Sequence, residues 1–161
     1  MVRTATASAG IIKNITLSGI VKSNKYAAGL IAYNQYNTLT LEAISVVDMT
    51  ISAIGSESYA GGIIAASNVP ALWIKNFGVQ GSSISANVAA SGAVGLVRFA
   101  DGVVQKTGAT YQVFNDAIYA EDGDIFRVTN NTINAQYAAG IYGELYDATG
   151  NSGIHAFNID A

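Results

Sequence analysis

The amino-acid sequence predicts an all-β domain, a single-stranded parallel β-helix of about four to five coils that we expect to be right-handed. A short glycine-containing phrase returns four times, which is typical of repeat architectures whose units bury their apolar faces against one another. Many β-branched residues and 17 glycines, with a single proline, favour short strands joined by tight corners. No apolar stripe of helical period persists over ten residues, so helix is disfavoured.

The glycine phrase defines the repeat. We align its central glycines as Gly29, Gly62, Gly95 and Gly140, which are 33, 33 and 45 residues apart. Glycine at this position predicts a close corner that excludes larger side chains. Tyrosines open three of the four phrases and are expected to stack in register, with the third coil lacking the ring at Gly92. These tyrosines are Tyr26, Tyr59 and Tyr137.

A Thr/Ser-x-Ser/Asn element precedes each glycine phrase. Alternation places its central apolar residue on the inner face of a strand and its polar residues on the outer face. The predicted outer residues are Thr16, Ser18, Thr50, Ser52, Ser83, Ser85, Thr132 and Asn134. Stacked over four coils they would form a flat, uncharged hydroxyl ladder that could bind a periodic partner such as ice, a glycan or another copy. Small polar residues also simply suit the outer face of a strand.

An apolar-x-x-apolar element leads the unit at Ile12–Ile15, Leu41–Ile44 and Ile74–Phe77. Each unit therefore holds about three short strands. We place the repeats near residues 12–37, 39–68, 72–101 and 125–145 of a single domain covering 1–161. The longer third spacing predicts an insertion or an irregular coil at 102–124.

Composition excludes several function classes. Only 12% of the residues are charged and the net charge is −3, with lysines and arginines scattered singly, so no nucleic-acid partner is expected. The absence of cysteine removes thiolate chemistry and disulfides. No stretch approaches the roughly 20 apolar residues that span a bilayer, so we expect no membrane insertion, and no signal peptide is visible. The low charge suggests that neighbouring chains cover part of the surface.

Candidate chemistry is sparse. Asp122 and Asp124 could supply oxygen ligands for calcium, but the alternating ligands and distal glutamate of a full loop are missing. A solvated acidic turn explains the same residues. His155, the only histidine, has no serine and acid at the spacing of a catalytic triad. We therefore expect no cofactor and no enzymatic activity, with a carbohydrate-active enzyme as the third hypothesis.

The phrase Gly-Leu/Ile-Ile/Val-Ala/Gly, following the Thr/Ser-x-Ser element, resembles the GLUG-type repeats of large bacterial and protist surface proteins. The resemblance covers about 12–145; the last glycine of the motif is replaced by Ala32, Ala65 and Arg98 and is present as Gly143. It implies a β-helical adhesin, stalk, coat or fibre, located outside the cell, on its surface or on a virion. Our leading hypothesis is a homo-oligomer or a protein assembled with neighbouring structural chains. The alternative is a glycan- or ice-binding module that uses the hydroxyl ladder.

Overall fold

The computed structural model describes residues 10–34, 39–67, 72–99, 118–119, 126–147, 154–155 and 159–160. All regular secondary structure in these ranges is β-strand, so the predicted all-β class is confirmed. They contain no helix of the length and apolar character needed to cross a membrane. The predicted insertion at 102–124 falls outside them, apart from the two residues Ile118–Tyr119.

The strands form three sheets, which we call A, B and C, and within each sheet the paired strands run parallel. Sheet A has nine strands, sheets B and C four each. The strands of sheet A are β1 (Gly10–Ser23), β4 (Leu39–Ala53), β7 (Leu72–Gln80), β8 (Ser83–Ser85), β11 (Ile118–Tyr119), β12 (Phe126–Thr129), β13 (Thr132–Asn134), β16 (Ile154–His155) and β17 (Ile159–Asp160). Those of sheet B are β2 (Tyr26–Ala28), β5 (Tyr59–Gly61), β9 (Ala89–Ser91) and β14 (Tyr137–Ala139). Those of sheet C are β3 (Ile31–Asn34), β6 (Ile64–Ser67), β10 (Val94–Phe99) and β15 (Tyr142–Asp147).

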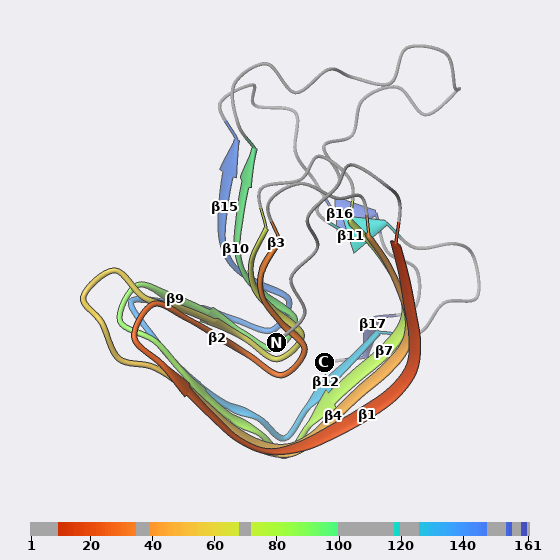
Figure 1. Ribbon diagram of the computed structural model, residues 1–161, viewed down its shortest axis with the longest axis horizontal. Coiled ribbons are helices and arrows are strands. Elements are labelled where there is room, and N and C mark those ends of the chain that lie inside the picture. The colour runs from red at the N-terminus through yellow and green to blue at the C-terminus, as the bar shows by residue number, and fades with distance from the viewer. Residues whose placement is uncertain are drawn as a thin grey trace.

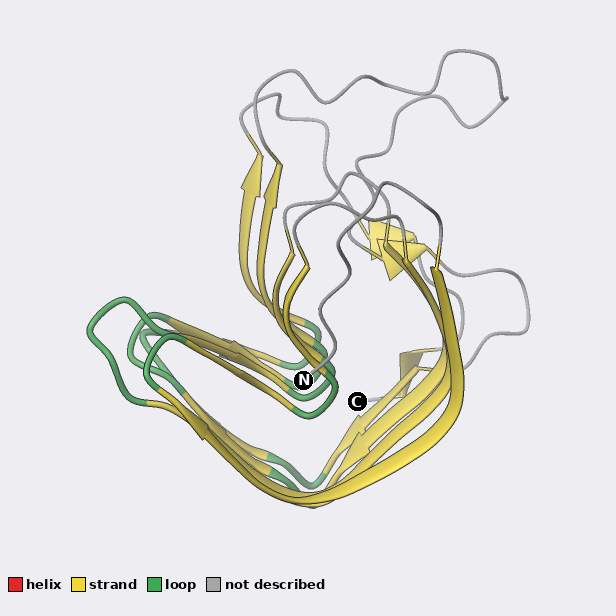
Figure 2. Ribbon diagram, viewed as in Figure 1, coloured by secondary structure: helices red, strands yellow, loops and turns green. Residues whose placement is uncertain are grey.

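The chain visits the sheets in the order A, B, C and repeats this path four times. The four units are β1–β3, β4–β6, β7–β10 and β12–β15. Strands of the same sheet lie over one another in Figure 1, and short loops make the corners between sheets in Figure 2. The segments that lead from sheet C back to sheet A fall largely outside the described residues. The described part of the chain thus consists of stacked parallel sheets rather than closed coils.

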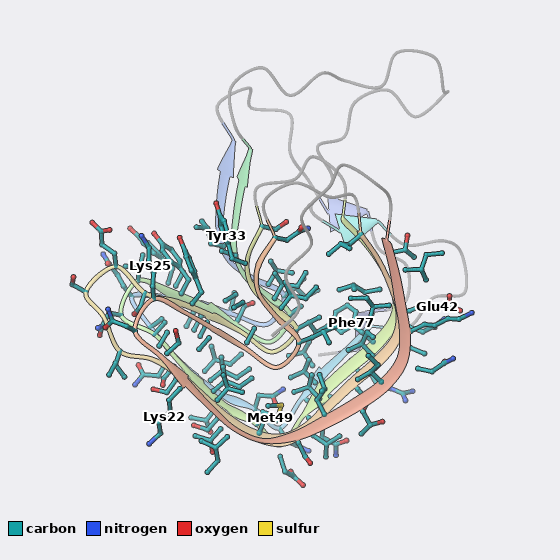
Figure 3. All side chains as sticks on the ribbon, in the orientation of Figure 1. Lys22, Lys25, Tyr33, Glu42, Met49 and Phe77 are labelled. Carbon is teal, nitrogen blue, oxygen red and sulfur yellow. The ribbon has the colours of Figure 1, made fainter. Side chains whose placement is uncertain are left out.

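Equivalent residues of successive units pair directly, which builds columns of like side chains through the stack. Ile15 pairs with Ile44, and Ile44 with Phe77. The alignment of the leading apolar elements of the first three units, as predicted from the sequence, is therefore confirmed. Ile44 and Phe77 are buried, and Figure 3 shows Phe77 pointing inward whereas Lys22 and Glu42 point outward. Apolar columns of this kind form the core, because alternate residues of each strand face the same side.

The third glycine phrase was misaligned by three residues. The structure places Gly29, Gly62, Gly92 and Gly140 at equivalent positions, instead of Gly95. The physical reason is a turn of unequal length. Ser52 pairs with Ser85, 33 residues later, whereas Tyr59 pairs with Ala89, 30 residues later, so the turn before β5 is three residues longer than the one before β9.

The new alignment also changes the residues at two neighbouring columns. The third member of the tyrosine column is Ala89, not Gly92. The last small residue of the motif is Gly95 in the third unit, not Arg98, and its equivalents are Ala65 and Gly143. A Cβ on Gly95 would meet the carbonyl oxygens of Ala60 and Ala65. Every residue of this column has a small side chain or none, because sheets B and C approach each other closely here.

Sheet A bends at two columns of residues with left-handed backbone conformation. Asn14, Ala43 and Asn76 form the first, with φ of 57°, 53° and 50°. Asp48, Gly81 and Asn130 form the second, with φ of 52°, 64° and 55°. A left-handed residue interrupts the alternation of a strand, which lets Ile12 and Ile15 both contribute to the core. Five of these six residues are Asn, Asp or Gly, types that tolerate this conformation better than others do.

Candidate functional site

The outer face of β4, β8 and β13 carries most of the predicted hydroxyl ladder. Thr50, Ser83 and Thr132 pair in one column, and all three are exposed. Their neighbours Ile51 and Ile84 are fully buried, as alternation requires. Adjacent strands of a sheet are about 4.8 Å apart, so the three hydroxyls are regularly spaced along the stack.

A second polar column runs beside the first. It contains Ser52, Ser85 and Asn134, of which the two serines are half-buried. The hydroxyl of Ser85 donates a hydrogen bond to the hydroxyl of Ser52 at 3.2 Å. Part of the hydrogen-bonding capacity of this column is therefore used within the protein, and the first column presents the more available hydroxyls.

The first unit does not contribute hydroxyls to this surface, so Thr16 and Ser18 were wrongly assigned to it. Thr16 pairs with Ser45, whereas Thr50 pairs with Ile20 and Ser52 pairs with Lys22. Ile20 is 73% exposed and Lys22 is also exposed. The hydroxyl surface, which we define as Thr50, Ser52, Ser83, Ser85, Thr132 and Asn134, thus covers three units. It is bordered on one side by an apolar and a cationic side chain.

A signal in the sequence could have prevented this error. Thr50 stands six positions after Ile44, and Ser83 stands six positions after Phe77, whereas Thr16 follows Ile15 directly. Counting from the leading apolar element would have pointed to the neighbourhood of Ile20. The Thr-Leu-Ser sequence of the first unit matches the motif by residue type alone.

Polar side chains, some buried and some exposed, tie successive units together, and sequence reasoning did not single them out. The buried Ser82 hydroxyl accepts a hydrogen bond from the Met49 backbone N–H and donates to the Gln80 carbonyl, each at 3.1 Å. Asn87 donates from its side chain to the carbonyls of Ile54 and Gly55, at 3.1 and 2.9 Å. The bonds of Ser82 with Met49 and of Asn87 with Ile54 and Gly55 cross a unit boundary, so they position the units along the stack.

Tyr26 packs against two other tyrosine rings, Tyr59 of its own column and Tyr33 of β3. The ring centroid of Tyr26 lies 5.9 Å from that of Tyr59 and 5.0 Å from that of Tyr33, and both pairs are stacked. The Lys25 ammonium lies 5.5 Å from the Tyr26 ring centroid. The predicted stacking of Tyr26 on Tyr59 is confirmed. Because the Tyr26 ring is engaged by other side chains of the protein, it stabilises the corner between sheets B and C.

The predicted calcium ligands Asp122 and Asp124 lie outside the described residues. Among the residues that are described, no three histidine, aspartate or glutamate side chains come together as metal ligands would.

Among the described residues, the strands at the two ends of the stack pair with a neighbouring strand on one side only. Within the described residues, β1, β2 and β3 are the terminal strands at one end, and β14 and β15 are terminal in sheets B and C at the other. In sheet A the second end consists of β13, β16 and β17, because β16 pairs with β11 and β17 pairs with β12. Unpaired strand edges present rows of N–H and C=O groups that can pair with another chain.

Comparison with known proteins gives no family for this chain. No protein-family model, no curated protein and no solved structure matches it.

Proposed function

We propose that this chain is a β-helical segment of a fibre, stalk, adhesin or coat, and that it acts as a non-enzymatic structural protein that self-associates. In this proposal each unit forms one coil of a right-handed, single-stranded parallel β-helix. The GLUG-like glycine phrase supports such an architecture, and an extracellular, cell-surface or virion location belongs to the same proposal.

The observation that carries the proposal is the stacking of four units with the same three-sheet path. Equivalent strands pair in parallel in each sheet, and terminal strands with an open edge remain at each end among the described residues. A stack of this kind extends by adding units without any change in its geometry. Long open edges favour association unless they are covered. A structural role that uses such association needs no catalytic residues.

Light scattering coupled to size-exclusion chromatography, across a wide range of protein concentration, tests the proposal. We expect a molar mass that rises with concentration and rods or filaments in negative-stain images. A single monomeric species at every concentration, with no elongated particles, would contradict it.

The hydroxyl surface favours a second candidate, recognition of a periodic ligand such as a glycan or ice. Its support is the exposure of Thr50, Ser83 and Thr132 in one column. Glycan-array binding and ice-recrystallisation assays on the parent and on Thr50→Leu and Ser83→Leu variants test this candidate. Thr16→Leu is the matched control, because Thr16 is exposed on the same sheet but lies outside the column. Equal binding by all four proteins, or no binding by the parent, would rule it out.

A further inference from the structure

We propose that the first unit is a protective cap of the stack, whose edge strand β1 resists pairing with β1 of a second copy. Two lysines that flank an uncharged segment of β1, together with an irregularity inside that segment, carry this inference. The proposed self-association then uses surfaces other than the β1 edge. The inference does not require that association, because an edge can be protected in a monomer as well.

The strand β1 has a long edge to protect. Among the described residues it pairs only with β4, so its other edge is open along a strand of 14 residues. Its segment 15–21 is rich in β-branched residues and contains no charge and no proline. Segments of about six or seven residues with this composition pair readily with other chains when they lie on an exposed edge. Ile20, which is 73% exposed, adds apolar surface to the segment.

A lysine stands at each end of this segment. Lys13 precedes it and Lys22 follows it, and both side chains are exposed. Figure 3 shows Lys22 pointing away from the core. Charged residues, lysine above all, protect edge strands because a pairing strand must approach the charge and displace its water. The two lysines therefore guard the segment from both sides.

The charge at Lys22 is not shared by the rest of its column. Its equivalents in the following units are Ser52, Ser85 and Asn134, all uncharged. The strands of the two serines, β4 and β8, have a partner on each side at this column. Asn134 lies on β13, which is terminal among the described residues, so the two ends of the stack differ in this respect. The lysine is thus a property of the first unit and not of the repeat.

The first unit carries charge of one sign only. Residues 10–34 contain three lysines, Lys13, Lys22 and Lys25, all exposed, whereas all 11 acidic residues of the chain come later. Two first units that met edge to edge would bring six ammonium groups together, three from each copy, with no carboxylate of the same units to neutralise them. Repulsion between like charges opposes this contact, and salt weakens the repulsion.

The backbone of β1 is irregular inside the same segment. Its pairing with β4 shifts between Leu17 and Gly19, where β4 contains one residue more than β1. Gly19 has a φ of 117°, which side chains of L-residues rarely adopt. An irregularity of this kind interrupts the row of N–H and C=O groups that a partner strand would use, and it is a second way in which proteins protect an edge.

Single-cysteine cross-linking tests whether the lysines keep the first units of two copies apart. The chain contains no cysteine, and Ser18 is exposed within the segment, so Ser18→Cys provides one reactive position there. We expect a short bismaleimide to give little dimer of this variant. Adding Lys13→Gln and Lys22→Gln, which remove the charges and keep most of the aliphatic stems, should raise the dimer yield about tenfold or more. Added salt should raise the yield of Ser18→Cys more than that of the triple variant.

Arg127→Gln in the Ser18→Cys background is the matched control for Lys22→Gln. Arg127 is an exposed cation on the same sheet, but its strand β12 is paired on both sides, with β7 and β17. Each substitution makes the net charge of −3 more negative by one. Lys22→Gln should raise the dimer yield and Arg127→Gln should not. Efficient cross-linking with both lysines present, or no gain after their removal, would overturn the inference.

Light scattering on the same samples separates the cap from the proposed self-association. Association of the parent, with first-unit cross-links only after removal of the lysines, supports both. A monomeric parent that gives first-unit dimers once the lysines are removed would overturn self-association and leave the cap standing. An associating parent whose first units cross-link with the lysines present would overturn the cap and leave self-association standing.

Discussion

The side chain of Asn131 hydrogen-bonds to the backbone near Ser82, which belongs to the neighbouring unit. Its side-chain oxygen accepts a hydrogen bond from the Ser82 N–H at 2.9 Å, and its side-chain nitrogen donates to the Val79 carbonyl at 2.7 Å. Asn131 stands one residue after the left-handed Asn130, at the second bend of sheet A. The side chain therefore bridges two units where the bend interrupts the regular ladder of backbone hydrogen bonds.

Asn131→Ala should lower the free energy of unfolding by about 1–3 kcal/mol, because it leaves buried backbone groups without partners. Urea unfolding followed by circular dichroism measures the effect as a lower midpoint with an unchanged slope. Gln136→Ala, at an exposed position of the same unit, is the control and should have little effect. Equal stability of the two variants would refute the bridging role of Asn131.

Gly62→Ala should prevent folding or severely destabilise the chain. A Cβ at this position would meet the Gly92 carbonyl oxygen and lie 2.8 Å from a methyl of Val79, inside the packed stack. The backbone must shift to accommodate it, and packed interiors resist such shifts. The measurement is the thermal unfolding midpoint, compared with that of Gly78→Ala.

Gly78→Ala is expected to be neutral or slightly stabilising, because no described residue lies within 4 Å of its Cβ and glycine weakens a strand. If Gly62→Ala were as stable as Gly78→Ala, this result would contradict the close approach of successive units at the glycine column.

Ala43→Asn should stabilise the protein. Ala43 is exposed and has a φ of 53°, a conformation that costs an ordinary L-residue roughly 1–2 kcal/mol and that asparagine tolerates better. The equivalent residues of the neighbouring units are Asn14 and Asn76. We expect a gain of about 0.5–1 kcal/mol in chemical unfolding. Ser45→Asn, on the same strand but outside the bend, should show no gain in stability. An equal gain in stability for Ser45→Asn would contradict the explanation by left-handed backbone conformation.

Ile51→Ala should cost about 2–5 kcal/mol of stability, because Ile51 is fully buried in a core column. Ile20→Ala, on the exposed face of the preceding strand, should change stability by no more than about 0.5 kcal/mol. Chemical unfolding of the two variants under identical conditions provides the comparison. Similar losses in both would contradict the assignment of inner and outer faces.

The all-β class could be predicted because its causes are local. The glycine phrase and the apolar-x-x-apolar element repeat in the sequence itself, and the structure places Ile15, Ile44 and Phe77 in one column as expected. Register was harder to predict. The turn before Tyr59 is three residues longer than its counterpart, so assuming equal spacing moved the third glycine from Gly92 to Gly95.

The candidate surface was predicted in part for the same reason. Thr50, Ser83 and Thr132 share a column because their units have equal spacing from the leading element. Thr16 matched the motif by residue type but lies beside Ser45. The hydrogen bond between Asn131 and Ser82 joins residues 49 positions apart and depends on the bend at Asn130. No local sequence pattern could therefore predict it.

The most direct test of the parallel register is a pair of spin-label experiments on double-cysteine variants at exposed positions. Ile20 pairs directly with Thr50, on strands about 4.8 Å apart, whereas Thr16 pairs with Ser45 and lies farther along the strand. We expect strong dipolar broadening for labels at residues 20 and 50 and much weaker broadening for labels at residues 16 and 50. Stronger broadening for the second pair would contradict the stacking on which the proposed assembly depends.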